Sequence, residues 1–243
     1  MKISIIIPAY NEEKLLPATL TAVKEAWSAF EAQGWQPELI VCDNNSTDQT
    51  AEVARAQGAH VVFEPNNQIA RARNSGARAA NGDWLVFVDA DSHPSRELFA
   101  EVAREIQQGR AVGGGAVVQM DGQVLPPIVR LANALWNGIS RWKRYAAGSF
   151  IYCETAAFRE LGGFSEDLYV TEEIEFSQRL KRLAKKRGKQ VVILTRHPLL
   201  TSARKLHLYS RGEYFRFLWR SVFSGGRQFR NRDQCHIWYD GRR

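Results

Sequence analysis

The sequence predicts an α/β fold in which a mostly parallel central sheet is flanked by helices. Short apolar runs alternate with longer segments of helical periodicity, as in successive strand–helix units. The run Trp84–Val88 contains no polar residue, which is typical of a strand buried on both faces of a parallel sheet. Glycines such as Gly34, Gly58 and Gly82 lie between these segments, where they indicate turns. Such a sheet, joined by right-handed crossovers, binds ligands beyond the carboxyl ends of its strands.

The first half of the chain contains the clearest strand–helix alternation. We expect strands at residues 2–8, 38–42, 60–63, 84–88 and 111–119. Helices are expected between them, at about residues 14–33, 47–57, 69–80 and 95–108. Ser46 and Gln49 have the spacing of a capping box, which predicts that the second helix begins just after Ser46. Gly113–Gly115 falls in or beside a strand, so it does not indicate a dinucleotide-binding loop.

The second half changes in character. Pro126-Pro127 opens a helix with apolar periodicity that runs to about Trp142. A strand at 148–153, a short helix, the turn Gly162-Gly163-Phe164, a helix from Thr171 and a strand at 190–195 are expected to follow. The predicted domain therefore covers residues 1–203, with one half at 1–119 and the other at 120–203, and leaves 204–243 as an extension.

Composition indicates a globular protein with a basic end. The 243 residues are 44% hydrophobic and carry a net charge of +7. From Arg204 onward there are ten Lys/Arg and three Asp/Glu, which accounts for the whole excess. Three distant cysteines predict neither a zinc site nor disulfides and fit the cytoplasm. No apolar run is long enough to cross a bilayer.

Two carboxylates directly follow the central strand. Asp89 and Asp91 are separated by one residue, so in an extended backbone they point to the same side beyond the strand end. Converging carboxylate oxygens suit Mg²⁺ or Mn²⁺ that is shared with substrate phosphates. Taken alone, the pattern fits an Asx turn that caps the next helix at least as well.

Several motifs occur in an order that resembles a known family. They are Ile5–Glu13, Asp43–Asp48, Ala72–Gly76, Asp89-Ala90-Asp91, Gly162-Gly163-Phe164 and the acidic run Glu172–Glu175. Together they resemble the family 2 glycosyltransferases of GT-A fold over residues 1 to about 195. The resemblance implies a metal-dependent enzyme, expected to invert, that moves a sugar from a UDP- or GDP-linked donor to an acceptor hydroxyl.

The resemblance also implies site residues. Pro8, Ala9, Tyr10, Asn11 and Glu12 would hold the nucleotide, Asp43 would bind the base, and Arg73 would lie near the nucleotide or its phosphates. Asp91 would bind Mn²⁺ or Mg²⁺ directly, with Asp89 nearer the ribose. Glu173 falls at the position of the catalytic base, where Glu-Glu replaces the usual Glu-Asp or Asp-Asp.

Arg204 is a candidate from its own chemistry. It belongs to the polar, basic run 201–205 after the last expected strand, and its guanidinium matches phosphate geometry. A solvated basic loop explains the same run equally well.

Two further functions compete with sugar transfer. A nucleotidyltransferase would carry a Gly-rich basic loop after the first strand, whereas Ala9–Glu13 is acidic and lacks glycine. A nucleic-acid-binding module leaves the carboxylates unexplained, since they would repel a phosphate backbone. We therefore expect no nucleic-acid partner.

The extension is expected to contain an aromatic, basic helix. Within residues 211–223, Phe215, Leu218, Trp219 and Val222 recur at spacings of three and four. Such a stripe can pack on the domain, or it can lie on the inner face of the membrane with arginines at anionic headgroups. A lipid-linked acceptor would suit the second interpretation.

Overall fold

The computed structural model describes residues 1–121, 127–204 and 227–235. Within them one sheet has the strand order β3-β2-β1-β4-β7-β6-β8-β5. The strands are β1 (Lys2–Ala9), β2 (Gln36–Asp43), β3 (His60–Phe63), β4 (Trp84–Val88), β5 (Ser92–His93), β6 (Ala111–Met120), β7 (Phe150–Glu154) and β8 (Gln190–Thr201). The helices are α1 (Leu16–Glu31), α2 (Thr50–Ala56), α3 (Ile69–Ala79), α4 (Arg96–Gln108), α5 (Pro127–Lys143), α6 (Thr155–Glu160) and α7 (Glu172–Lys186).

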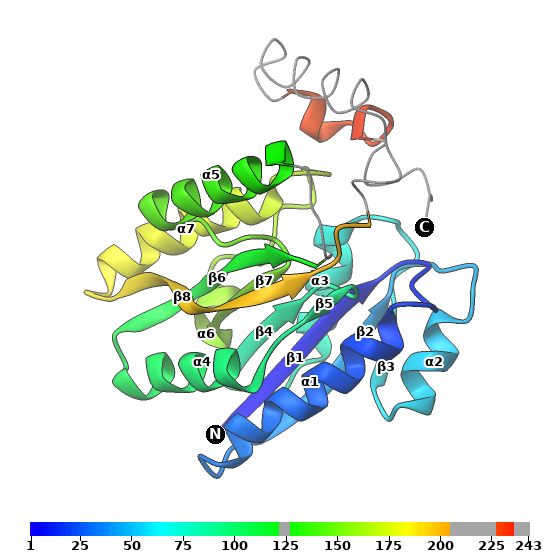
Figure 1. Cartoon of the computed structure of the whole chain (residues 1–243), viewed down its shortest axis with the longest axis horizontal. Helices are drawn as coiled ribbons and strands as arrows, with labels where there is room; N and C mark the ends of the chain where they lie inside the picture. The colour runs from blue at the N-terminus through cyan, green and yellow to red at the C-terminus, as the bar shows by residue number, and fades with distance from the viewer. Residues whose placement is uncertain (122–126, 205–226, 236–243) are drawn as a thin grey trace.

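Helices cover both faces of the sheet, as Figure 1 shows. On β1, Ile3, Ile5 and Ile7 face the cluster that contains α1 and α4, whereas Ile6 faces α3, α6 and α7. Both sets are fully buried. This period-two division explains why the strand is apolar on both sides, and it confirms the layered α/β architecture.

The sheet departs from uniform parallel pairing at β7. β1 pairs in parallel with β2 and β4, β2 pairs in parallel with β3, and β6 pairs in parallel with β8. β7 lies between β4 and β6 and is antiparallel to both. The alternation of strands and helices in the sequence does not predict the position of β7 in the sheet, because a long segment that contains α5 separates β7 from β6.

The predicted capping box is wrong. α2 begins at Thr50, and its N-cap residue, Gln49, makes no side-chain cap hydrogen bond. Ser46 Oγ instead accepts a hydrogen bond from the backbone N–H of Asn11, at 3.0 Å. The hydroxyl of Ser46 is thus bound by the loop after β1 and not by the first turn of α2. β8 is also longer than expected and extends to Thr201.

The glycines of β6 allow the neighbouring backbones to approach closely. A Cβ on Gly114 would overlap the carbonyl oxygen of Val192 on β8. We expect Gly114→Ala to destabilise the fold by about 1–3 kcal/mol or more, because the strand pair must separate to admit the methyl group. Thermal and urea unfolding would measure the loss.

Gly138→Ala is the matched control. Gly138 lies inside α5 with nothing within 4 Å of the added Cβ. This substitution should raise stability by about 0.5–1 kcal/mol through its higher helix propensity. Equal stabilities of the two variants would contradict the role assigned to Gly114.

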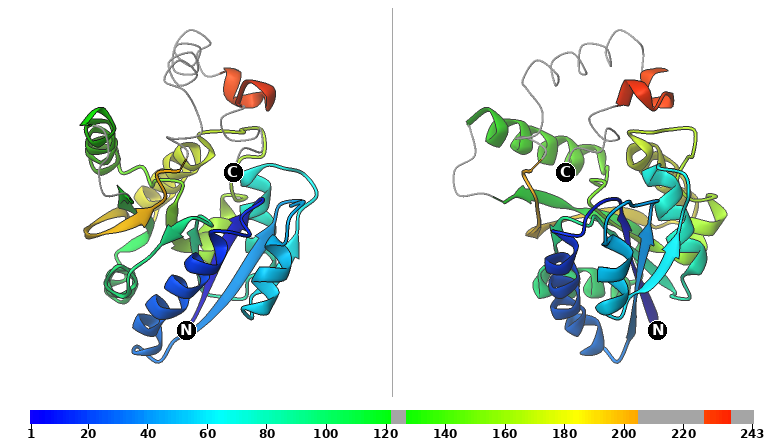
Figure 2. Two further views of the ribbon diagram at one scale, coloured as in Figure 1. Left: turned by 45° about the vertical axis from the view of Figure 1, so that its right-hand side comes forward. Right: turned by 90° about the vertical axis from the view of Figure 1, so that its right-hand side faces the viewer.

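The described part of the C-terminal extension consists of η1 (Arg227–Arg230) and η2 (Asp233–Cys235). The backbone N–H of Tyr169 donates to the carbonyl oxygen of Phe229 at 2.7 Å, so this part rests beside the loop before α7. Figure 2 shows it at the end of the molecule near the site described below. The expected helix at 211–223 lies outside the described residues. In the ranges described, no helix has the length and apolarity needed to cross a membrane.

Candidate active site

The loops after β1 and β2 are joined to each other. The backbone N–H of Thr47 donates to Asn11 Oδ1 at 2.8 Å, and the N–H of Asn44 donates to the Ala9 carbonyl at 2.7 Å. Asp43 accepts from the N–H of Ser46 at 3.1 Å. The structure thus brings the segment Pro8–Glu12 and Asp43 together at the carboxyl edge of the sheet.

The two aspartates after β4 reach the same edge. The side chain of Asp89 is 26% exposed and that of Asp91 is 14% exposed. A turn holds the segment, with the N–H of Ser92 donating to the Asp89 carbonyl at 3.1 Å. The N–H of Ser202 donates to the Asp91 carbonyl at 3.0 Å, which brings the end of β8 to this loop.

Arg204 enters the site from the far end of the chain. Its guanidinium forms a bidentate pair with Glu12, at 2.9 and 2.7 Å. Nη2 also lies 3.6 Å from Asp91 Oδ2. Burial lowers the pKa of Arg204, but Glu12 and Asp91 outweigh it and raise the pKa above its usual value. The arginine therefore neutralises the acidic loop after β1 and links it to the aspartates.

Arg73 lies at the centre of a buried ionic cluster and is only 1% exposed. Nη1 lies 2.6 Å from Glu172, and Nη2 lies 3.0 Å from Asp89 and 2.8 Å from the Gly148 carbonyl. Burial lowers the pKa of Arg73, but the charges of Asp89, Glu172 and Glu173 outweigh it and raise the pKa. The guanidinium binds acidic side chains of the protein itself. Its predicted proximity to the phosphates of a nucleotide stays a prediction.

The two glutamates of the Glu-Glu pair have different surroundings. Glu172 is buried and held by Arg73, whereas Glu173 is half-buried as a residue and its carboxylate carbon lies 3.7 Å from a Cβ placed on Gly148. Burial raises the pKa of Glu173 to about 8, and the charge of Glu172 contributes to the rise. Burial also raises the pKa of Glu172. Because Arg73 engages Glu172, Glu173 is the candidate proton acceptor of the pair.

The segment Ala72–Gly76 serves the packing around this cluster. Asn74 Nδ2 donates to the Phe164 carbonyl at 2.9 Å, and Asn74 Oδ1 accepts from the Phe164 N–H at 2.9 Å. A Cβ on Gly76 would lie 2.5 Å from a methyl group of Ile6, so α3 can approach β1 only with glycine here. Sequence reasoning missed the roles of Asn74 and Glu172, although both stood inside motifs.

Backbone strain accompanies the site loops. Asn11 and Asn45 have φ values of 52° and 63°, and Thr171 has a φ of 70°. Asparagine tolerates the left-handed region, but a β-branched residue there is unusual. Thr171 immediately precedes the Glu-Glu pair and makes no side-chain cap hydrogen bond. Strain of this kind is concentrated at functional sites.

The residues that can hold a metal are the two aspartates. Their oxygen atoms are the ligand type that Mg²⁺ and Mn²⁺ prefer. Within residues 1–121, 127–204 and 227–235, no cluster of three or more His, Cys, Asp or Glu side chains is arranged to hold a metal ion.

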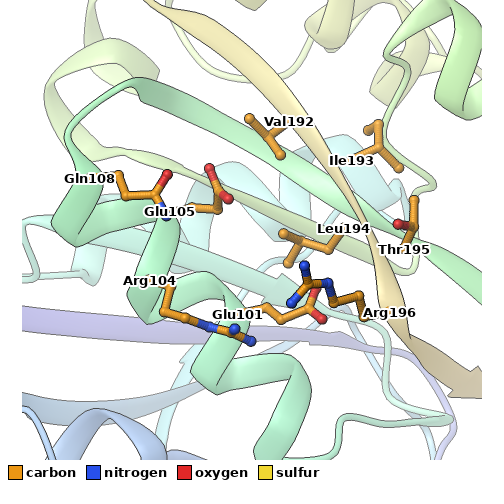
Figure 3. A pocket seen from close by; sticks show the side chains of 9 residues that line it. All are labelled: Glu101, Arg104, Glu105, Gln108, Val192, Ile193, Leu194, Thr195 and Arg196. Carbon is orange, nitrogen blue, oxygen red and sulfur yellow. The ribbon is translucent and has the colours of Figure 1, made fainter.

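A cavity of about 350 Å³ lies between α4 and β8 (Figure 3). Glu101, Arg104, Glu105 and Arg196 line it, and none of its lining residues belongs to the predicted site. Within the described chain, Glu101 Oε1 has no hydrogen-bond partner, and His197 Nε2 lies 3.6 Å away. No pattern in the sequence predicted this cavity.

Residues 4–161 match the family model described as glycosyl transferase family 2. The chain belongs to this family. Glu172 and Glu173 lie beyond the matched family 2 region. The uncharacterized glycosyltransferase Rv0539 of Mycobacterium tuberculosis is 30% identical over 135 residues, which are 56% of this chain and 57% of that protein. The 4,4'-diaponeurosporenoate glycosyltransferase of Staphylococcus haemolyticus is 35% identical over 44% of this chain and 30% of its own length. The chain thus spans little more than half of the mycobacterial relative.

Solved structures of glycosyltransferases share the fold. The mannosyltransferase PcManGT of Pyrobaculum calidifontis, in complex with GDP-Man and Mn²⁺, gives a TM-score of 0.67 at 18% identity, over 94% of this chain and 62% of that chain. S. aureus TarS in complex with UDP-GlcNAc gives 0.64 at 20% identity, over 98% and 69%. These similarities confirm the GT-A fold of this family 2 member.

Proposed function

We propose that this protein transfers a sugar from a nucleoside-diphosphate sugar to an acceptor hydroxyl, with inversion at the transferred carbon. The observation that carries the proposal is the convergence of the loops after β1, β2 and β4 on the partly exposed carboxylates of Asp89 and Asp91. Glu173 lies beside the same cluster, since Arg73 Nη2 and the carboxylate carbon of Glu173 both come within 4 Å of a Cβ placed on Gly148. Family 2 membership supports glycosyl transfer as the reaction class.

The donor is proposed to occupy the joined loops. Pro8–Glu12 and Asp43 would bind the nucleoside, since their polar atoms stand at the carboxyl edge of parallel strands. PcManGT contains GDP-Man and TarS contains UDP-GlcNAc, so both bases are candidates. Arg204 would reach the diphosphate only by giving up contact with Glu12.

Asp91 and Asp89 are proposed to hold Mn²⁺ or Mg²⁺. The neighbours PcManGT and glucosyl-3-phosphoglycerate synthase were solved with Mn²⁺, which supports a divalent cation. When bound, the cation would neutralise charge on the departing diphosphate. Asp91 is proposed as the direct ligand because Asp89 Oδ1 already accepts a hydrogen bond from Arg73 at 3.0 Å, whereas Asp91 Oδ2 lies 3.6 Å from Arg204.

Glu173 is proposed as the catalytic base. As the acceptor oxygen bonds to the sugar carbon, the bond from that carbon to the phosphate oxygen breaks and the hydroxyl proton passes to the Glu173 carboxylate. A raised pKa makes Glu173 a stronger base than an ordinary glutamate. Arg73 would position it by holding Glu172 and Asp89 on either side.

Lipid-linked molecules are included among the proposed acceptors. The staphylococcal relative is named for 4,4'-diaponeurosporenoate, and the chain has a basic, aromatic end. The proposal places the enzyme in the cytoplasm, with contact at the inner face of the membrane through the extension. The residues expected to make that contact lie outside the described part of the chain.

A thermal-shift screen tests the donor proposal. UDP- and GDP-sugars, each with and without Mn²⁺ or Mg²⁺, should raise the melting temperature only for the correct pair, because a ligand of the native state stabilises it. A ligand concentration of about 100 times Kd corresponds to about 2.7 kcal/mol. The proposal fails if no nucleotide sugar stabilises the protein under any metal condition.

Asp91→Asn should preserve the fold and weaken metal-dependent donor binding by at least about tenfold, since it removes a carboxylate charge from the cation. Isothermal titration with the donor, at fixed Mn²⁺ and in chelator, would measure the effect. Asp83→Asn is the control, because Asp83 lies at the opposite end of β4. Unchanged metal dependence in Asp91→Asn would exclude Asp91 as the ligand.

A further inference from the structure

Helix α5 binds the sheet through polar side chains. Asn137 Oδ1 accepts from the backbone N–H of Val118 at 3.0 Å. Asn133 and Asn137 both donate to the Val118 carbonyl, at 3.0 and 2.8 Å. The side of α5 that faces β6 is therefore held by amide hydrogen bonds.

The apolar side of α5 is turned outward. Leu131, Leu135, Ile139 and Trp142 recur at spacings of three and four, and they are 55%, 59%, 47% and 77% exposed. With small residues between them, they line an apolar hollow of about 350 Å³. Amphipathic helices of globular proteins normally bury this stripe in the core. Figure 2 shows α5 at the rim of the molecule, where the stripe can meet a large surface.

The charged residues of α5 are all cations. By helical spacing, Arg130 and Arg141 lie on the side of α5 that carries Asn133 and Asn137, whereas Lys143 lies next to the stripe, and all three are exposed. Lys143 Nζ stands 3.8 Å from the ring centroid of Trp142. None of the 17 residues of α5 is acidic. The outward apolar stripe of α5 thus has Lys143 at its edge, on a helix whose charged residues are all cations.

We propose that this outward face of α5 lies in the surface of an anionic membrane. A helix with leucine and tryptophan on one side, and only Lys and Arg among its charged residues, is the pattern of a helix that lies in the headgroup region. Its cations complement anionic lipid headgroups. Pairing with α5 of a second copy would bring like charges together, so the charge pattern favours lipid. The inference does not depend on the proposed sugar transfer.

Docking of α5 at a membrane would also fix the position of the candidate active site relative to that membrane. The chain leaves α5 at Lys143 and within a few residues reaches Gly148, whose carbonyl binds Arg73, and Ser149, whose carbonyl binds the N–H of Asp89 at 3.2 Å. A helix anchored at a bilayer would therefore hold the ionic cluster close to that surface.

Sedimentation of the full-length protein with vesicles tests the proposal. The wild type should bind vesicles of phosphatidylcholine with roughly 30% phosphatidylglycerol, and bind pure phosphatidylcholine far less. Leu135→Ser/Trp142→Ser should lower the partition coefficient by at least about tenfold, because it removes apolar area from the inserted face. Its melting temperature should not change, since both side chains are exposed.

Phe63→Ser provides a matched control. Phe63 is 59% exposed on β3, away from α5, so its replacement should leave vesicle binding unchanged. Lys143→Gln should reduce binding by about fivefold at low salt, because it removes the cation next to Trp142, and this loss should shrink as salt rises.

Three results would overturn the proposal. The first is a wild type that does not bind anionic vesicles. The second is equal binding by the wild type and Leu135→Ser/Trp142→Ser, which would place the contact on another surface. The third is a dimer, measured by light scattering, that Leu135→Ser/Trp142→Ser converts to a monomer, since the occupant would then be a second copy.

Discussion

Glu173→Gln is expected to lower kcat by about 10²- to 10⁴-fold while leaving donor affinity nearly unchanged. The amide keeps the shape of the side chain but cannot accept the proton of the acceptor hydroxyl. Glu172 cannot replace it, because its carboxylate is buried and bound to Arg73 at 2.6 Å. Steady-state kinetics combined with donor titration would separate the two parameters.

The pH profile provides a second readout of Glu173. Since the pKa of Glu173 is raised to about 8, its carboxyl is protonated and inactive as a base at lower pH. In the wild type, kcat/KM should therefore rise about tenfold per pH unit below this value and level off above it. Glu173→Gln should abolish this rise along with most of the activity.

Glu175→Gln is the control for Glu173→Gln. Glu175 is on the same helix, but Arg179 holds its carboxylate at 2.6 Å. Its replacement should leave kcat and the pH profile unchanged. A Glu173→Gln variant that lost donor affinity but retained wild-type turnover would instead assign Glu173 to the nucleotide pocket.

Arg73→Met is expected to destabilise the protein by about 3–5 kcal/mol, because it leaves buried acids without their cation. Glu172 and Asp89 would both lose their ion pair, and the Gly148 carbonyl would lose its donor. Urea unfolding at several pH values would measure the loss.

The destabilisation of Arg73→Met should depend on pH. Without the cation, the folded-state pKa of Glu172, which burial already raises, should rise further above that of the unfolded chain. A raised carboxyl pKa makes the contribution to stability largest at low pH, and that contribution is lost as pH rises through the folded-state value. The deficit should thus be smaller near pH 5 than near pH 8.

Arg55→Met controls for the loss of an arginine. Arg55 is 60% exposed, and its ion pair with Glu52 spans 3.7 Å on the surface of α2. Its replacement should change stability by no more than about 0.5 kcal/mol at any pH. If Arg73→Met were equally mild, the ionic cluster would have no structural role.

Local sequence determined the elements and the edge of the sheet where ligands would bind. The apolar run Trp84–Val88 predicted a strand buried on both faces, and β4 is completely buried. The carboxylates after this strand, and the polar loops after β1 and β2, were placed at one edge because parallel strands end together. Period and turn chemistry act over a few residues, so sequence alone reveals them.

Only the tertiary structure decided which distant groups meet. Arg73 pairs with Glu172 across 99 positions, and Arg204 pairs with Glu12 across 192. Ser46 does not cap α2 as predicted, because its hydroxyl accepts a hydrogen bond from the backbone N–H of Asn11, 35 positions earlier. The antiparallel insertion of β7 and the outward apolar face of α5 arise in the same way. Such contacts depend on how the layers pack. Local propensity reflects only neighbouring residues, so it cannot predict a partner that folding brings from elsewhere in the chain.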